Sequence, residues 1–198
     1  QTRVNVTING VPYNDSESYM SYWVDLPDFA SSIESIQVQR GVGTSTNGPA
    51  AFGGSINILT NAASEKPLFE INNTLGSFNT VKNSIGFSTG FINDKFEFSG
   101  RLSRIKSDGY IDRSGSKLRS YFLQGIFKDE NSLLKILTFA GHEVTDQAWF
   151  GIDSSTLETN RKYNPAGEYY DKMGNTLYYD DQDDNYKQDH YQFHWNQS

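Results

Sequence analysis

The stretch from Arg40 to Thr60 indicates the fold more clearly than any other part of the chain; it reads R-G-V-G-T-S-T-N-G-P-A-A-F-G-G-S-I-N-I-L-T. The residues before it, Ser35 to Gln39, alternate in polarity and predict a strand. Ser55 to Thr60 alternate again, with Ile56 and Ile58 on one face. Glycines and other small residues fill the space between, where glycine permits turns and close backbone approaches. The stretch therefore predicts two strands joined by a glycine-rich loop.

A phosphate-binding loop is the other interpretation of such a pattern, and the residues exclude it. The Walker motif ends in Gly-Lys-Ser/Thr, and no lysine occurs between Arg40 and Thr60. The dinucleotide fingerprint needs a third glycine three residues after the second, at the start of a helix. Thr46 stands at that distance from Gly43, and the residues that follow are strand-like.

Two motifs in this region resemble the plug domain of TonB-dependent receptors of bacterial outer membranes. In that family a strand is followed by Arg-Gly, a loop of small residues, Tyr or Phe before Gly, and a strand of the type I-N-I-x-T. Here the matching elements are Ile33 to Arg40, Gly41, Ala51 to Gly54, and Ile56 to Thr60. Upstream, N-V-T-I-N-G-V-P (Asn5 to Pro12) is similar to the plug's strand that ends in Asp/Asn-Gly-Val/Ile-Pro, although Asp is more usual than Asn at position 9.

Composition agrees with a β-rich protein. The chain has 198 residues, of which 14% are aromatic and only 5 are proline. No apolar run reaches the length of about 18 residues that a membrane helix needs. The chain begins at Gln1 without a Met start or a signal peptide, so we expect a cleaved or partial chain. The absence of cysteine excludes disulfides and thiolate chemistry, and the net charge of −7 argues against a nucleic-acid partner.

After about residue 62 the chain alternates with a period of two residues. Phe96, Phe98 and Leu102 share one parity, opposite Glu97 and Arg101. Connections alternate between tight turns, such as Asn93-Asp94, and long loops, such as Asp146 to Asn185, as they do in outer-membrane barrels. A short link near residues 75–80, on the nominally outer side, is a mild exception to this rule.

The predicted fold class is therefore dominated by β-structure: a piece of a mixed α+β plug, followed by about six antiparallel strands. The resemblance implies that these strands belong to a twenty-two-stranded transmembrane barrel. Residues 1–62 are predicted to be the C-terminal part of the plug and residues 63–198 the first, incomplete part of the barrel. Asp28, with Pro27 before it, is predicted to cap a short helical turn that ends at Ser32.

Candidate ligand-binding residues are aromatic or polar side chains in two loops. In the family, the loop after the first plug strand faces the substrate outside the cell, and here it carries Tyr13, Asn14, Tyr19, Tyr22 and Trp23. Rigid amphipathic rings and adaptable amides suit ligand contact, although an ordinary surface loop is the alternative. The long loop offers a second, weaker set: Trp149, Phe150, Tyr163, Tyr169 and Tyr170.

Arg40 and Glu34 are candidates for holding the plug in place, since a guanidinium and a carboxylate can pair in a bidentate geometry. The resemblance implies that Arg40 joins an ion network between plug and barrel. Two unrelated surface charges are the alternative.

No metal, cofactor or catalytic site is predicted. His190 and His194 would lie about 13 Å apart on one strand face, and the acidic run from Asp180 to Asp184 lacks the glycine and glutamate of an EF-hand. A solvated acidic loop is the preferred interpretation, and divalent bridging to lipopolysaccharide stays open. No nucleophile–base pattern supports a barrel enzyme.

The resemblance implies active import across the outer membrane, driven by TonB, which would contact an N-terminal segment absent from this chain. The glycine loop favours a ferric siderophore or another iron chelate as ligand. Cobalamin, haem and glycans are alternative substrates, and a soluble β-sandwich binding module is an alternative class. The other implied partners are outer-membrane lipid and lipopolysaccharide.

Overall fold

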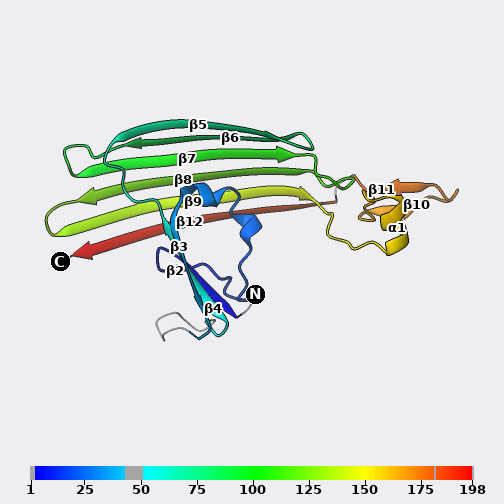
Figure 1. Ribbon diagram of the computed structural model, residues 1–198, viewed down its shortest axis with the longest axis horizontal. Helices are drawn as coiled ribbons and strands as arrows, with labels where there is room; N and C mark the ends of the chain where they lie inside the picture. The colour runs from blue at the N-terminus through cyan, green and yellow to red at the C-terminus, as the bar shows by residue number, and fades with distance from the viewer. Residues whose placement is uncertain (1–2, 43–50, 181, 198) are drawn as a thin grey trace.

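The computed structural model describes residues 3–42, 51–180 and 182–197. It contains a small sheet, a large curved sheet and a loop module beyond one end of the large sheet (Figure 1). We call the small one the plug sheet and the large one the barrel sheet, after the predicted domains. No helix within the described residues is long and apolar enough to cross a membrane.

The plug sheet has the strand order β2-β1-β4-β3. Its strands are β1 (Val4–Ile8), β2 (Val11–Pro12), β3 (Ile33–Arg40) and β4 (Gly54–Thr60). The central pair β1 and β4 is parallel, with Val6 opposite Ile56 and Ile8 opposite Ile58. Val6, Ile8 and Ile58 are buried, as expected for β-branched residues that alternate toward a core. The predicted strands on both sides of the glycine loop are confirmed, while residues 43–50 of that loop lie outside the described residues.

The barrel sheet is a six-stranded antiparallel meander with the order β12-β9-β8-β7-β6-β5. Its strands are β5 (Pro67–Gly76), β6 (Thr80–Thr89), β7 (Phe96–Ser107), β8 (Ser116–Lys128), β9 (Ser132–Asp146) and β12 (Asp183–Gln197). They contain 10 to 15 residues each, enough to cross a membrane at a tilt. The prediction of six antiparallel strands is confirmed.

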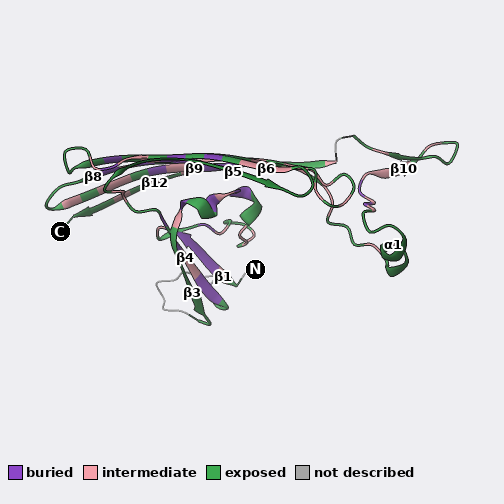
Figure 2. Cartoon of the chain, turned by 45° about the horizontal axis from the view of Figure 1, so that its top comes forward, coloured by how far each residue is buried: buried purple, intermediate pink, exposed green. Residues whose placement is uncertain are grey.

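The two faces of the barrel sheet differ, as the period-two pattern predicted. One face carries Ser84, Glu97, Arg101, Gln124 and Glu143, all buried. We call it the lumen face, because the plug sheet lies against it. The opposite face carries exposed apolar side chains at alternate positions, and we call it the outward face. Figure 2 shows that the buried part of the barrel sheet lies near its middle, over the plug.

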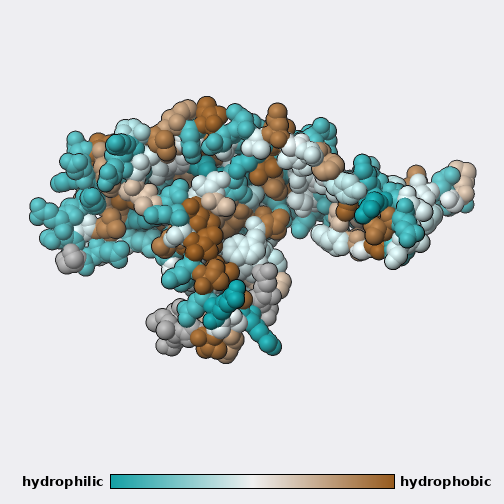
Figure 3. All heavy atoms as spheres, viewed as in Figure 1, coloured by the Kyte–Doolittle hydropathy of each residue, from teal (hydrophilic) through white to brown (hydrophobic). Residues whose placement is uncertain are grey.

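The long connections lie at one end of the barrel sheet, together with the short link between β5 and β6, which is the exception expected from the sequence. The tight turns that follow β6 and β8 lie at the opposite end, where Figure 3 shows mostly hydrophilic side chains. At the end with the long connections, β9 and β12 are joined by the loop module, which contains α1 (Ser154–Thr159), β10 (Glu168–Tyr170) and β11 (Thr176–Tyr178). The connector between the two sheets runs from residue 61 to 66, and the domain border that we propose after residue 62 falls within it.

Two short 3-10 helices link β2 to β3, namely η1 (Trp23–Asp25) and η2 (Phe29–Ser32). The predicted helical turn after Asp28 is therefore present as η2. The predicted cap is wrong in its chemistry, because the Asp28 side chain forms no capping hydrogen bond with the backbone of η2. Asp28 has a left-handed backbone (φ 57°), and its carboxylate points to the barrel sheet instead.

Candidate functional site: the plug–barrel interface

Asp28 is the centre of an ion cluster that joins the plug to the lumen face. Its Oδ2 accepts hydrogen bonds from Arg101 Nη1 at 2.8 Å and from Ser103 Oγ at 2.5 Å, both on β7. Its Oδ1 accepts from Lys82 on β6 and from Ser31 Oγ at 2.6 Å. Arg101 also donates from Nε to Ser32 Oγ at 2.8 Å. One plug carboxylate is thus bonded to two cations and a hydroxyl from two neighbouring barrel strands.

The cluster is strongly desolvated, since Arg101 is only 6% exposed. Burial on its own would raise the pKa of Asp28. Hydrogen bonds from Lys82, Ser103 and Ser31, with the charge of Arg101, instead hold that pKa below its ordinary value. Asp28 is therefore ionised at neutral pH, and its single negative charge is shared between two cations.

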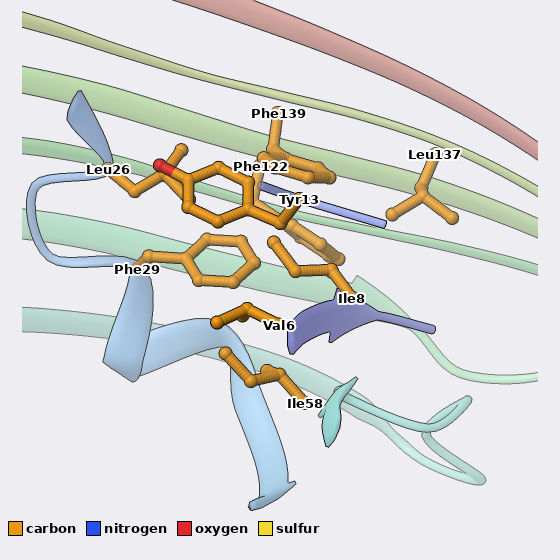
Figure 4. Close-up of a cluster of buried hydrophobic side chains, with 9 residues drawn as sticks. All are labelled: Val6, Ile8, Tyr13, Leu26, Phe29, Ile58, Phe122, Leu137 and Phe139. Atoms are coloured by element: carbon orange, nitrogen blue, oxygen red, sulfur yellow. The ribbon is translucent and has the colours of Figure 1, made fainter. Parts of the chain in front are cut away.

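An aromatic cluster lies beside the ion cluster and completes the contact. Phe29 of η2 packs on Phe139 of β9 with ring centroids 4.9 Å apart. Phe139 in turn stacks on His190 at 4.6 Å, and Tyr13 contacts the same imidazole at 5.6 Å. Figure 4 shows Tyr13, Phe29 and Phe139 with the β-branched residues of β1 and β4 in one continuous core. The plug has no core separate from the barrel sheet here, because Phe122, Leu137 and Phe139 complete it.

The end of β1 is hydrogen-bonded to β12. Gln192 donates from Nε2 to the carbonyl of Ile8, and Asn9 donates from Nδ2 to Gln192 Oε1, both at 3.2 Å. Asn9 Oδ1 accepts from the backbone N–H of Thr60 at 3.0 Å. An amide can donate and accept in this way whereas an ionised carboxylate only accepts, which explains the Asn at a position where Asp is more usual.

Glu34 and Arg40 lie at opposite ends of β3 and are both exposed. Glu34 Oε2 accepts from the backbone N–H of Ala62 at 2.8 Å and attracts the ammonium of Lys135 on β9. Lys135 also donates to Thr60 Oγ1 at 2.9 Å. Among the described residues, the ion pairs between plug and barrel are those of Asp28, and neither Glu34 nor Arg40 forms one. The role of Arg40 in a plug–barrel network stays a proposal.

The five proposed ligand residues of the plug loop divide into two groups. Tyr13 is buried and donates to the carbonyl of Tyr22 at 2.8 Å. The Asn14 side chain is hydrogen-bonded to the plug backbone: it accepts from Val6 N at 2.7 Å and donates to the carbonyls of Val4 and Tyr19. Tyr19, Tyr22 and Trp23 are exposed. The structure thus makes Tyr13 and Asn14 the support for three exposed rings, which remain our proposed ligand contacts.

The proposed residues of the long loop lie in or near the loop module. Trp149 and Phe150 are exposed neighbours with ring centroids 6.2 Å apart. Tyr163 and Tyr170 both donate to the carboxylate of Glu168, and the two hydroxyls lower the pKa of that carboxyl. Tyr169 stacks on Tyr179 at 4.5 Å. Tyrosine hydroxyls therefore stabilise the module internally, while Trp149, Phe150 and the Tyr170 ring face solvent.

Sequence reasoning missed Asn164, which fixes the loop module to the rest of the chain. Its amide is only 2% exposed and donates to the carbonyls of Asp112, Arg113 and Gln147 at 2.9 to 3.2 Å. Its Oδ1 accepts from Ala166 N at 3.0 Å. A motif could not reveal it, because its partners are backbone atoms of the connection between β7 and β8 and of a distant part of its own loop.

We expect Asn164→Ala to loosen the loop module without unfolding the barrel sheet. The substitution leaves three backbone carbonyls without this donor, which costs about 1–3 kcal/mol. Hydrogen exchange should accelerate across residues 147–182 only. Asn160→Ala, which removes an exposed amide from the same loop, is the control. Equal exchange in both variants would refute the role of Asn164.

Three carboxylates meet where η1 approaches β9 and β12. Asp25 is buried, Glu143 is 1% exposed, and Asp184 lies close enough to both to repel them. Burial, reinforced by the charge of Asp184, raises the pKa of Asp25 from 3.8 to about 6. No group of three His, Asp or Glu side chains is arranged to hold a metal ion anywhere in residues 3–42, 51–180 and 182–197.

The raised pKa of Asp25 makes plug docking dependent on pH. The docked plug binds a proton that a released plug loses near pH 4, so this contribution is complete below about pH 4 and disappears as pH rises through about 6. The shift corresponds to about 2–3 kcal/mol. We expect the protection factors of the plug amides, which are corrected for the intrinsic pH dependence of amide exchange, to be higher at pH 5 than at pH 7, and Asp25→Asn to abolish most of that difference. An unchanged difference in that variant would contradict the assignment.

The fold and this interface define an architecture: a small mixed sheet docked on one face of a six-stranded antiparallel sheet. A family model described as "TonB-dependent Receptor Plug Domain" matches residues 1–55. No curated protein sequence matches the chain.

Solved structures with the same fold are outer-membrane receptors. FpvA of Pseudomonas aeruginosa, bound to heterologous pyoverdines, matches with a TM-score of 0.67 at 14% identity, over 93% of this chain and 24% of that one. The ferric yersiniabactin uptake receptor FyuA of Yersinia pestis matches with 0.60 at 18% identity, over 73% and 23%. The ferric-catecholate import receptor Fiu of E. coli K12 matches with 0.60 at 15% identity, over 74% and 21%.

The match of residues 1–55 to the plug model, together with the fold that the chain shares with solved outer-membrane receptors, supports its interpretation as a piece of a TonB-dependent receptor. The chain spans 21–24% of the length of the three solved receptors.

Proposed function

We propose that the protein imports a ferric siderophore or a similar iron chelate across the outer membrane, driven by TonB. The observation that carries the proposal is the docking of the plug on the lumen face by one ion cluster and one aromatic cluster. Such a plug closes the passage through a barrel at rest and can be displaced as a unit when the contacts are pulled apart. The chelate specificity of the structurally similar receptors supports iron as the cargo.

In this function the ligand binds from the side of the long connections. Tyr19, Tyr22 and Trp23 provide an exposed aromatic surface on the plug, held in place by Tyr13 and Asn14. Trp149 and Phe150 provide a second surface at the root of the loop module. Aromatic rings bind planar chelators over a large area at a low cost in conformational entropy.

The plug's remaining task is mechanical. The N-terminal residues precede β1, the central strand of the plug sheet, which is bonded to β12 through Gln192. A pull on the chain before β1 therefore acts directly on the interface with the barrel. TonB would supply that pull through a segment upstream of this chain.

The test is growth of a strain without the receptor gene under iron limitation, supplied with a panel of ferric siderophores, haem and ferric citrate. We expect growth to fail on one chelate and to return with the gene, but not with a copy that lacks the TonB-contacting segment. Growth on every iron source would refute iron as the cargo, and cobalamin and glycans would be tested next.

A further inference from the structure

A cluster of carboxylates lies where η1 of the plug meets the lumen face near the long connections. Its members are Asp25 of η1, Glu143 of β9 and Asp184 of β12, and we call them the acidic cluster. The strand register places Glu143 opposite Tyr186, two residues after Asp184 on the same face of β12. Asp25 lies over Gly141, two residues before Glu143 on the same face of β9. Three separate elements thus bring their carboxylates to one place.

The acidic cluster carries charge that the described part of the chain does not balance with a cation. The ion pairs between described side chains involve Asp28 or Asp189, and none involves Asp25, Glu143 or Asp184. Glu143 is 1% exposed, and its Oε2 has no hydrogen-bond partner. Buried carboxylates are ordinarily paired or fully hydrogen-bonded, because the desolvation of an unpaired charge is costly. An unpartnered buried oxygen beside two further carboxylates therefore indicates a cationic group from outside the described chain.

The acidic cluster is open toward the side from which we propose that the ligand enters. Asp184 is exposed and stands at the start of β12, next to the long connections. Tyr186 is also exposed, and it lies near Asp25 and near Tyr22, one of the three exposed rings of the plug loop. Trp23, another of these rings, belongs to η1 together with Asp25. Aromatic faces beside carboxylates suit an ammonium group, which binds by charge and by cation–π contact.

We propose that the imported chelate carries a protonated amine, which the acidic cluster binds while the exposed rings of the plug hold the rest of the chelate. The described carboxylates are not arranged to hold a metal ion. An organic ammonium has three donors that can reach separate carboxylates, so it fits this arrangement better than a metal does. An amine on a flexible arm passes Asp184 first, and the charges of Asp25 and Glu143 lie behind it.

The same carboxylates repel an anionic chelate, so the acidic cluster selects among iron chelates by their charge. This inference rests on the proposed import of an iron chelate and names the class of chelate.

The test measures equilibrium binding of iron chelates to the complete, detergent-purified receptor by the quenching of tryptophan fluorescence. The probes are three ferric chelates, of the hydroxamate, catecholate and hydroxycarboxylate types, each prepared with a free terminal amine and with that amine acetylated. Acetylation removes the positive charge and leaves the iron centre unchanged. We expect the native receptor to bind the amine form of one chelate roughly tenfold to a hundredfold more tightly than the acetylated form, the range of hydrogen bonds to charged groups.

Two variants assign this preference to the acidic cluster. Asp184→Asn replaces an exposed side chain, so the fold should persist, and we expect the preference for the amine form to fall severalfold. Asp184→Asn combined with Glu143→Gln should bring the two forms close to equal binding. Asp183→Asn makes the same change at the neighbouring residue of β12, which has the opposite parity, and is the matched control that should keep the native preference.

The outcomes separate this inference from the proposed function. If the native receptor bound a chelate equally well in its two forms, the acidic cluster would not be an ammonium site, and iron import would stand. An undiminished preference in both Asp184→Asn and the double variant would also overturn the inference. If none of the six complexes bound, the proposed import of an iron chelate would itself be refuted, and this inference with it.

Discussion

Asp28→Ala is expected to release the plug from the barrel wall. The variant leaves Arg101 buried without its carboxylate and also removes the partner of Lys82, Ser31 and Ser103. Breaking a buried ion pair by removing one partner costs about 3–5 kcal/mol, because an uncompensated charge remains. Such a loss is a large part of the stability of a small domain. We expect plug amides to exchange rapidly, and cells to become sensitive to antibiotics too large for ordinary porins.

Two further variants separate the ion cluster from a general loss of stability. Asp15→Ala removes an exposed carboxylate of the same plug whose hydrogen bonds are local, so the exchange of the plug should hardly change. Asp28→Asn combined with Arg101→Gln removes both charges and should recover part of the stability lost in Asp28→Ala, as removal of whole buried pairs does elsewhere. If the plug amides of Asp28→Ala exchanged at the native rate and the cells kept their antibiotic resistance, the ion cluster would not hold the plug in place.

Gly141→Ala is expected to displace the plug by steric conflict alone. Gly141 lies on the lumen face of β9, where an added Cβ would collide with the carbonyl of Asp25 and with Pro27 Cδ. Both obstacles are backbone or ring atoms that cannot rotate away. Overpacking of this kind costs about 1–3 kcal/mol and sometimes more. We expect faster exchange in η1 and η2, and a barrel sheet that is otherwise intact.

Gly125→Ala is the matched control for Gly141→Ala. Gly125 is a glycine of the neighbouring strand β8 on the outward face, and its added Cβ would meet only the Phe98 ring at an ordinary 3.5 Å. In Gly125→Ala, the plug amides should exchange at the native rate. If the two variants were indistinguishable, the close approach of the plug backbone to β9 would not hold the plug in place.

The plug motif and the barrel strands could be predicted from the sequence because they depend on local patterns. The alternation of Phe96 and Phe98 against Glu97 is set by the two-residue period of a strand, and it survives any tertiary context. The strands on both sides of the glycine loop follow for the same reason.

The interface itself could not be predicted, because its contacts join residues far apart in sequence. Asp28 and Arg101 are 73 residues apart in the sequence. An Asp just before a helical turn is predicted to be its N-cap unless the barrel strand beside it is known. The emphasis on Arg40 came from a family motif and its role stays a proposal, whereas the plug–barrel ion pairs within the described residues are those of Asp28. Asn14 and Asn164 look like loop residues in the sequence, yet both are bonded to backbone atoms that only the fold brings near.

Import by displacement of the plug is tested most directly by tethering the plug to the barrel. Ser31 and Ser103 lie close together because both hydroxyls donate to the carboxylate of Asp28, and the chain contains no cysteine. Ser31→Cys with Ser103→Cys, joined by a short bismaleimide, should bind the iron chelate at the cell surface and fail to import it. Each single cysteine variant, treated with the same reagent, should import normally. Import at the full rate with the tether closed would contradict plug displacement.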